Sequence, residues 1–223
     1  NGNKLEMQPG GSLPKSERVL KDSKVKYLDL KSMEKNMTAL SAKWAKAEEV
    51  NAAYDFSDMN RRHIDAKGDV AHLDIDAAEL QGNRVTATLG EKTRLIVNVD
   101  AEGADDITLP QLDVDGINHA EYAHWTDKGV IYNLTDSKSE DGQYHGRVGT
   151  AGATSSVILA PEADVDASQN VEGQIIARNV VIGGEFHRNS VNVPITRHVE
   201  VRLDGQDKTE TTPFVAPQPA REH

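Results

Sequence analysis

Cysteine is absent from this 223-residue sequence, and aromatic residues make up only 4% of it. Without cysteine, disulfide bonds, thiolate metal sites and cysteine nucleophiles are all excluded. Hydrophobic residues of every kind amount to 37%. A supply this low in aromatic residues predicts a thin core of Val, Ile, Leu and Ala rather than a thick globular interior.

Positive charge and long apolar runs are also scarce. The 25 Lys and Arg residues stand against 36 Asp and Glu, for a net charge of −11 at pH 7. Nucleic acid is not expected as a partner because phosphate binding depends on clusters of Lys and Arg. No stretch reaches the roughly 20 apolar residues of a membrane span, so membrane insertion is not expected either. The opening "NGNKLEMQPGG" lacks an initiating Met and a signal peptide, and we expect the chain to belong to a longer one.

One segment has the apolar spacing of an α-helix. In "LDLKSMEKNMTALSAKWAKAEEV" apolar residues recur every three or four positions, at Leu30, Met33, Met37, Leu40, Trp44 and Ala47. Asp29 is a suitable N-cap for this helix. The spacing predicts one long helix over roughly residues 30–49 that packs a narrow seam against the rest of the domain. A partner-binding helix or a coiled coil is the alternative.

From Val70 onward the sequence favours β-strands. Short runs rich in Val, Ile, Leu and Thr are bounded by Gly, Asn or Asp, as strands are. These runs are "VAHLDIDAAEL", "NRVTATL", "TRLIVNVDA", "DITLPQLDVDGI", "GVIYNLT" and "SSVILAPEADVDA". A single helix beside so many strands argues against alternating βαβ units.

Two segments in the last third of the chain align when the sequence is shifted by 17 positions. The shift places Ile158, Leu159 and Ala160 on Ile175, Ile176 and Ala177, and it also places Ala163 on Val180 and Val165 on Ile182. Stacked coils of a β-solenoid produce such self-similarity. The sequence therefore predicts a mainly β fold, a β-solenoid or β-helix-like domain with one long α-helix packed alongside.

Several segments together resemble the choice-of-anchor A family of bacterial cell-surface proteins. The similarity covers residues 27–190 and is carried by "MEKNMTALSAKW", "GDVAHLDIDAAEL", "TRLIVNVDAEG" and "GVIYNLTDS". It is strongest in "VILAPEADVDASQNVEGQIIARNVVIGGEFH". Tyr132 stands where the family usually has Trp, and "HRNSVNVPI" departs from the family's closing segment.

The resemblance implies a non-enzymatic adhesive module on an ice-binding-like β-helix scaffold. It implies an extracellular location, anchored to the cell surface or cell wall of a Gram-positive-type bacterium, within a longer multidomain chain. The implied partner is a host extracellular matrix protein or a cell-surface glycan. A polysaccharide-processing enzyme on a β-helix scaffold and a structural surface-layer or ice-binding-like domain remain alternatives. An ice-binding surface needs a repeated Thr array, whereas "TAT" at 86–88 occurs once.

The sequence patterns and the resemblance together divide the chain into three parts. Residues 1–26 are expected to form an irregular segment or an edge strand, and residues 27–205 the adhesive domain. Residues 206–223, rich in Pro and Thr, read as a linker towards a stalk or anchor.

The segment "GGEFH" (183–187), which ends the region of strongest resemblance, contains an acid and a histidine two positions apart. Glu185 and His187 would project from one face of a strand, where such a pair can serve as an acid–base couple or hold a metal. No third ligand or nucleophile has a recognisable spacing to them. We therefore expect both side chains to bond backbone groups at a turn between stacked strands. Together with Asn133 in "GVIYNLTDS", they are assigned to the structural motif, and no catalytic residue is predicted.

Two further patterns are candidates for ion or ligand binding. "LDVDG" (112–116) and "DVDAS" (164–168) carry alternating carboxylates, as calcium loops do, but both lack the remaining ligands. Solvated acids on strand edges are the preferred interpretation, and no cofactor is expected, with Ca²⁺ an unsupported alternative. In "HAEYAHW" two histidines are separated by four residues, a pair that can bind zinc on a helix, but no glutamate stands where the HExxH order requires the general base. An exposed loop is predicted there, whose side chains suit ligand contact: His119, Tyr122, His124 and Trp125.

Overall fold

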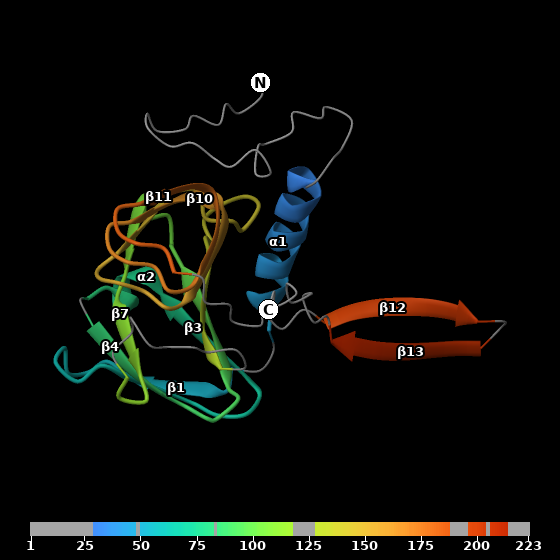
Figure 1. The fold of residues 1–223 in the computed structure, drawn as a ribbon, viewed down its shortest axis with the longest axis horizontal. Helices are drawn as coiled ribbons and strands as arrows, with labels where there is room; N and C mark the ends of the chain where they lie inside the picture. Colours follow the sequence, from blue (N-terminus) through green and yellow to red (C-terminus); the bar gives the residue numbers. More distant parts are fainter. Residues whose placement is uncertain are drawn as a thin grey trace, which may run out of the picture.

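The computed structural model describes residues 29–47, 50–82, 84–117 and 128–187, and the backbone of 196–203 and 206–213. The described part is mainly β-structure (Figure 1), which confirms the predicted class. Its strands are β1 (Ala52–Asp55), β2 (His63–Ala66), β3 (Val70–Asp76), β4 (Arg84–Leu89), β5 (Arg94–Asp100), β6 (Asp106–Leu109), β7 (Gln111–Val114), β8 (Gly129–Thr135), β9 (Arg147–Thr150), β10 (Val157–Ala167), β11 (Gln174–Ile182), β12 (Thr196–Leu203) and β13 (Gln206–Pro213). The helices are α1 (Leu30–Trp44) and α2 (Ala77–Leu80).

The strands from β2 to β11 pair in parallel and form three stacks. The helix-covered stack contains β3, β5, β8, the first half of β10 and the start of β11. The β4 stack contains β2, β4 and β7, with β1 antiparallel at its edge. The β9 stack contains β6, β9, the second half of β10 and the end of β11. From β4 to β6, and again from β7 to β9, the chain passes through the three stacks in turn.

Alternation along the strands builds the core. In β5, Leu95, Val97 and Val99 belong to the main cluster of buried residues, whereas Ile96 belongs to the cluster beneath α1. A strand covered on both faces therefore reads as a continuous apolar run. The main cluster consists of Ala, Val, Leu and Ile with Tyr132 and Tyr144, and this agrees with the thin aliphatic core expected from composition.

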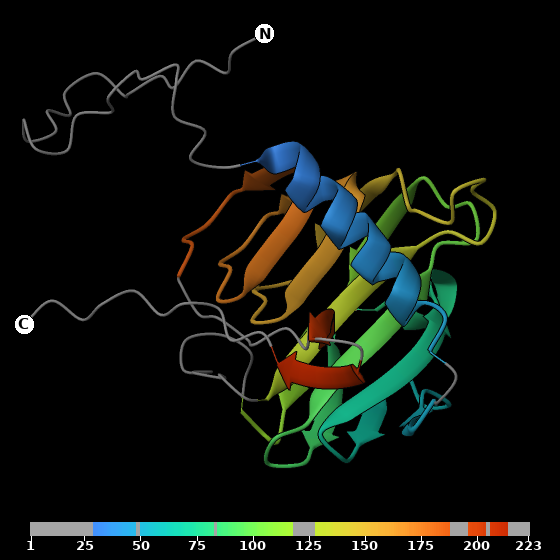
Figure 2. The same cartoon turned by 90° about the vertical axis from the view of Figure 1, so that its right-hand side faces the viewer.

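The helix α1 lies across the outer face of the helix-covered stack (Figure 2). Asp29 caps it as predicted, because its side chain accepts a hydrogen bond from the Ser32 N–H at 3.2 Å. The prediction of one long helix over residues 30–49 was wrong, since α1 has 15 residues and α2 only 4. The Trp44 carbonyl accepts hydrogen bonds from the Ala47 N–H and from the side chain of Asn98, and the contact with Asn98 fastens the end of the helix to the sheet.

The apolar side of α1 packs against the sheet only along the half of the helix that ends at Trp44. Trp44 is buried, and Met37 and Leu40 pack partly buried beside it. Their partners on the sheet are Ile96, Ile131, Val157 and Leu159. At the other end of the helix, the side chains of Leu30 and Met33 are 63% and 47% exposed. Neither described helix has the length and apolar character that crossing a membrane requires.

The 17-residue offset is correct for the first half of its span. Ile158, Leu159 and Ala160 pair with Ile175, Ile176 and Ala177, which confirms those three matches. The other two matches were wrong, because Val165 pairs with Val180 and Ala167 with Ile182, an offset of 180 − 165 = 15. The register shifts between Ala160 and Asp164, a segment that contains Pro161. Proline has no N–H to donate and is placed at such irregularities in a sheet.

The six predicted strand runs all contain strands, and one of them contains two. "DITLPQLDVDGI" is divided at Pro110 into β6 and β7. Strands β1, β2, β9, β12 and β13 were not predicted, nor was α2. Strands β12 and β13 form a separate antiparallel pair, and the predicted boundary between 205 and 206 falls between these two strands. The extent of the domain stays a prediction, and residues 1–26 lie outside the described ranges.

Candidate functional site

Asn133 belongs to a ladder of polar side chains that crosses three strands beneath the end of α1. The strand register aligns Asp74 of β3, Asn98 of β5 and Asn133 of β8. The Asn98 amide group donates to Asp74 at 2.8 Å and to the Trp44 carbonyl at 2.9 Å. The Asn133 amide group donates to the Asn98 side-chain oxygen at 2.9 Å and to the Ser41 carbonyl at 3.0 Å.

This ladder fastens the end of α1 to the sheet. The Ser41 and Trp44 carbonyls accept backbone hydrogen bonds from Ala45 and Ala47, and each also receives a buried side-chain donor from the sheet. On β10 the next position is Leu159, which has no polar group, so the side-chain oxygen of Asn133 is left without a hydrogen-bond partner. The ladder stops there, and its open end at Asp74 and Asn98 borders a pocket.

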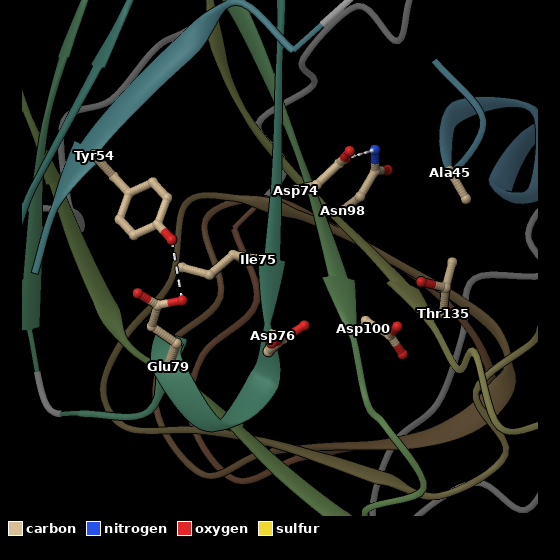
Figure 3. Close-up of a pocket in the computed structure, with 9 residues that line it drawn as sticks. All are labelled: Ala45, Tyr54, Asp74, Ile75, Asp76, Glu79, Asn98, Asp100 and Thr135. Atoms are coloured by element: carbon tan, nitrogen blue, oxygen red, sulfur yellow. Dashed lines mark hydrogen bonds between the residues drawn. The ribbon is translucent and has the colours of Figure 1, made fainter. Parts of the chain in front are cut away.

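The pocket has a volume of about 340 Å³ and lies where β3, β5 and β8 end (Figure 3). Parallel strands bring their carboxyl ends to one edge, and the register aligns Asp76, Asp100 and Thr135 there. The full lining is Ala45, Tyr54, Asp74, Ile75, Asp76, Glu79, Asn98, Asp100 and Thr135. Four carboxylates therefore surround one pocket.

Tyr54 and Glu79 form one side of this pocket. The Tyr54 hydroxyl donates to Glu79 at 3.0 Å (Figure 3). That hydrogen bond, with a smaller effect of burial, raises the pKa of Tyr54. The ring of Tyr54 is packed edge-on against Phe56 with centroids 5.0 Å apart, yet 38% of the residue remains exposed. An aromatic surface held in this way is available for stacking.

Asp100 is held on the opposite side by the turn after β5. Its carboxylate accepts hydrogen bonds from the N–H groups of Glu102 at 3.0 Å and Ser137 at 2.9 Å. Burial opposes ionisation, but these hydrogen bonds outweigh it and lower the pKa of Asp100. Asp100 is therefore ionised at neutral pH and has a fixed orientation.

The chemistry of the pocket suits a polyhydroxylated ligand. Carboxylates and an amide oxygen accept hydrogen bonds from hydroxyl groups, and an exposed ring offers an apolar face. Within the described ranges, no three acidic or histidine side chains are grouped so as to hold a metal ion. The expectation that no cofactor is bound stays a prediction.

Glu185 and His187 meet a third residue that the sequence did not indicate. The imidazole of His187 pairs through Nδ1 with Glu172, which is buried, and through Nε2 with Glu185 at 3.3 Å. The hydrogen bond and charge of Glu172 are the main causes that raise the pKa of His187. The expected side-chain bonds to backbone were wrong, because carboxylates are the partners.

The backbone of the same segment continues the parallel stacking. The His187 N–H donates to the Val171 carbonyl at 2.8 Å, and the Val171 N–H donates to the Glu185 carbonyl at 2.9 Å. Asn170 adds a side-chain acceptor for the Glu185 N–H at 3.0 Å. The structural role assigned to Glu185, His187 and Asn133 stays a prediction that substitutions can test.

The remaining candidates fall in two groups. His119, Tyr122, His124 and Trp125 lie outside the described residues. In the calcium-loop candidates, Asp113 pairs with Arg84, Asp115 with Lys128 and Asp164 with Arg178. Asp113 is buried, so it is not the solvated acid that was expected.

The residues of the pocket were missed although a signal was present. "HLDID" and "IVNVD" each end a strand on Asp, and parallel pairing would bring these ends together. Tyr54 and Glu79 carry no such signal, because β1 and α2 were not predicted.

Comparison with known proteins places the chain among adhesive domains. Residues 1–188 match the family described as "Putative Ice-binding-like adhesive domain". Since the match covers most of the 223 residues, the chain belongs to this family. No curated protein and no solved structure matches it. The match confirms the adhesive class implied by the resemblance, without singling out choice-of-anchor A.

Proposed function

We propose that the chain is a non-enzymatic ligand-binding module of a bacterial surface adhesin. Membership of an adhesive-domain family over residues 1–188 is the observation that supports this most strongly. The proposed partner is a host cell-surface glycan or an extracellular matrix protein. The finer assignment to the choice-of-anchor A type, and to the wall of a Gram-positive-type cell within a longer chain, belongs to the same proposal.

The proposed scaffold is a β-solenoid. Parallel pairing in three stacks, with the chain visiting the stacks in turn, is what successive coils produce. A stack of hydrogen-bonded coils is rigid along its length, and a rigid element positions binding groups more accurately than a loop does. Within the described residues, Arg84, Thr86 and Thr88 of β4 point away from the core and are exposed, so this side of the β4 stack is available for contact.

The proposed contact site is the carboxylate-lined pocket of Figure 3. Its volume of about 340 Å³ lies within the range of small-ligand sites. Tyr54 would stack on the apolar face of a sugar ring, while Asp76 and Glu79 would accept its hydroxyl groups. This chemistry favours a glycan over a flat protein surface.

A binding panel tests the proposal. The full chain is applied to immobilised host glycans and matrix proteins, and saturable binding to at least one glycan is expected. The same glycans are incubated with the chain and analysed for newly formed reducing or unsaturated ends. Release of such ends would favour the polysaccharide-processing alternative, for which the four pocket carboxylates would be the candidate acids. Absence of any binding would contradict the adhesive proposal.

A further inference from the structure

A second pocket has the opposite charge. It has a volume of about 500 Å³ and is lined by the loop before β2, the turn after α2 and the first part of β4. Its lining is Met59, Asn60, Arg61, Arg62, Gly82, Arg84 and Thr86. Three arginines in one pocket are unexpected in a chain with a net charge of −11. We call it the arginine pocket.

Arg62 is the fixed element of the arginine pocket. The residue is only 3% exposed. Its Nη1 and Nη2 groups donate to the carbonyls of Gln81 at 2.8 Å and Glu79 at 2.6 Å. The guanidinium carbon lies 4.1 Å from the centre of the Phe56 ring. These contacts hold the planar group in one orientation.

The charge of Arg62 is only partly balanced by the surrounding chain, because the charge of Glu79 acts on it from nearby without a direct ion pair. Among the residues that the structure describes, no carboxylate forms an ion pair with Arg62, and its buried Nε has no hydrogen-bond partner. Burial lowers the pKa of Arg62. A buried charge that lacks a direct ion-pair partner is costly, and a bound anion would offset that cost.

Gly82 lies directly against the guanidinium of Arg62, and both residues line the pocket. A Cβ atom at this position would overlap Nη1 of Arg62, so any side chain would occupy the space beside the charge. Two more cations flank the opening: Arg61, whose side chain is 86% exposed, and Arg84, whose side chain is 59% exposed. Arg84 is held by Asp113, while the ion-pair partner of Arg61 among the described residues is Asp58, at a distance of 4.0 Å.

We propose that the arginine pocket binds the carboxylate of an acidic sugar residue. The planar guanidinium groups match a carboxylate in geometry and charge. The volume is that of a ring-sized ligand, whereas a single acidic side chain of a peptide would leave most of it empty. Thr86 and Asn60 supply polar groups for the ring hydroxyls. The choice of a saccharide rests on the proposed adhesive function, and the choice of an anion rests on this pocket alone.

The test is isothermal titration of the full chain with a galacturonic acid trisaccharide and with its methyl ester. The ester has the same ring and size but no charge. Saturable binding of the acid is expected, with the ester at least about tenfold weaker, the effect of losing one charge-assisted hydrogen bond. Equal binding of the two forms, or no binding of the acid, would overturn the proposal.

Substitutions locate the site. Arg61→Gln alters an exposed side chain and should weaken binding of the acid about tenfold without changing thermal unfolding. The matched control is Arg147→Gln, which removes an arginine of 65% exposure on the β9 stack and should change binding by less than about twofold. Equal losses in both variants would indicate general charge attraction and contradict the assignment. Arg62→Lys keeps the charge but removes the planar fork, and should also weaken binding if circular dichroism shows a folded chain.

The proposal for the arginine pocket can fail while the proposed adhesive function holds, and the experiments distinguish the two cases. Neutral glycans that bind the carboxylate-lined pocket should be unaffected by Arg61→Gln. If they bind while the galacturonic acid trisaccharide does not, the adhesive function stands and the arginine pocket is refuted as an anion site.

Discussion

Replacing Asn133 by alanine should destabilise the domain substantially. Asn133 is fully buried, and its amide group donates to the Ser41 carbonyl at 3.0 Å and to the Asn98 side chain at 2.9 Å. The substitution removes two buried hydrogen bonds, but the Ser41 carbonyl keeps the Ala45 N–H as a partner. The full cost of about 1–3 kcal/mol therefore applies to the Asn98 oxygen, and the lost bond to Ser41 adds about 0.5–1.5 kcal/mol. Removing the unpartnered oxygen of Asn133 returns part of that cost. We expect a net loss of about 2–4 kcal/mol in the free energy of unfolding.

Urea denaturation followed by circular dichroism measures this loss. In a domain of this size it corresponds to a melting temperature lower by roughly 4–16 °C, at about 2–4 °C for each kcal/mol. The matched control is Asn179→Ala, because Asn179 is exposed and donates to Asp164 at the surface of the β9 stack. That control should change stability by less than about 0.5 kcal/mol. If the two variants were equally stable, the ladder would not be what anchors α1.

Three other predictions concern stability. Trp44→Ala should lower the free energy of unfolding by about 3–5 kcal/mol. Leu30→Ala, at the exposed end of α1, should lower it by less than about 0.5 kcal/mol. Equal losses of the two variants in urea denaturation would contradict the conclusion that α1 packs against the sheet mainly at its Trp44 end. Because Glu172 raises the pKa of His187, the stabilisation that His187 provides should be complete below its ordinary value near pH 6.5 and lost as pH rises through the raised pKa. Denaturation of wild type and His187→Ala between pH 5.5 and 9 should therefore converge at high pH, and a constant difference would refute the ion pair. Gly173→Ala should unfold the domain or lower its melting temperature strongly, because the new Cβ would collide with a backbone carbonyl just before β10. If the variant melted at the same temperature as the wild type, this close approach would be absent.

Local patterns predicted much of the fold. The start of α1 followed from Asp29 and the apolar spacing, and the strand runs followed from their β-branched residues and flanking turns. The pairing of Ile158 with Ile175 followed from self-similarity, because stacked strands place equivalent residues side by side. Each of these properties is contained within a short segment.

Features that depend on distant residues could not be predicted in this way. The last turn of the helix is fastened to the sheet by Asn98 and Asn133, far along the chain, which donate to the carbonyls of Trp44 and Ser41. The change of offset after Ala160 depends on the irregularity around Pro161, which an ungapped alignment cannot represent.

The candidate site also depends on residues that lie far apart in the sequence. The carboxylate-lined pocket requires the register that aligns Asp76 with Asp100, and it also requires Tyr54 from a strand that the sequence did not reveal. The partner of His187 was missed for a similar reason, since Glu172 lies 15 residues away and only the stacking brings the two together.

The most direct test of the central claim is the affinity of the full chain for the glycan that binds best in the panel, compared with two pocket variants. Tyr54→Ala removes the exposed ring, and Asp76→Asn removes the charge of an exposed carboxylate while keeping its shape. Each should weaken binding about tenfold, and Asn179→Ala, outside the pocket, should not change it. Unchanged affinity in both pocket variants would contradict the claim that this pocket is the contact site.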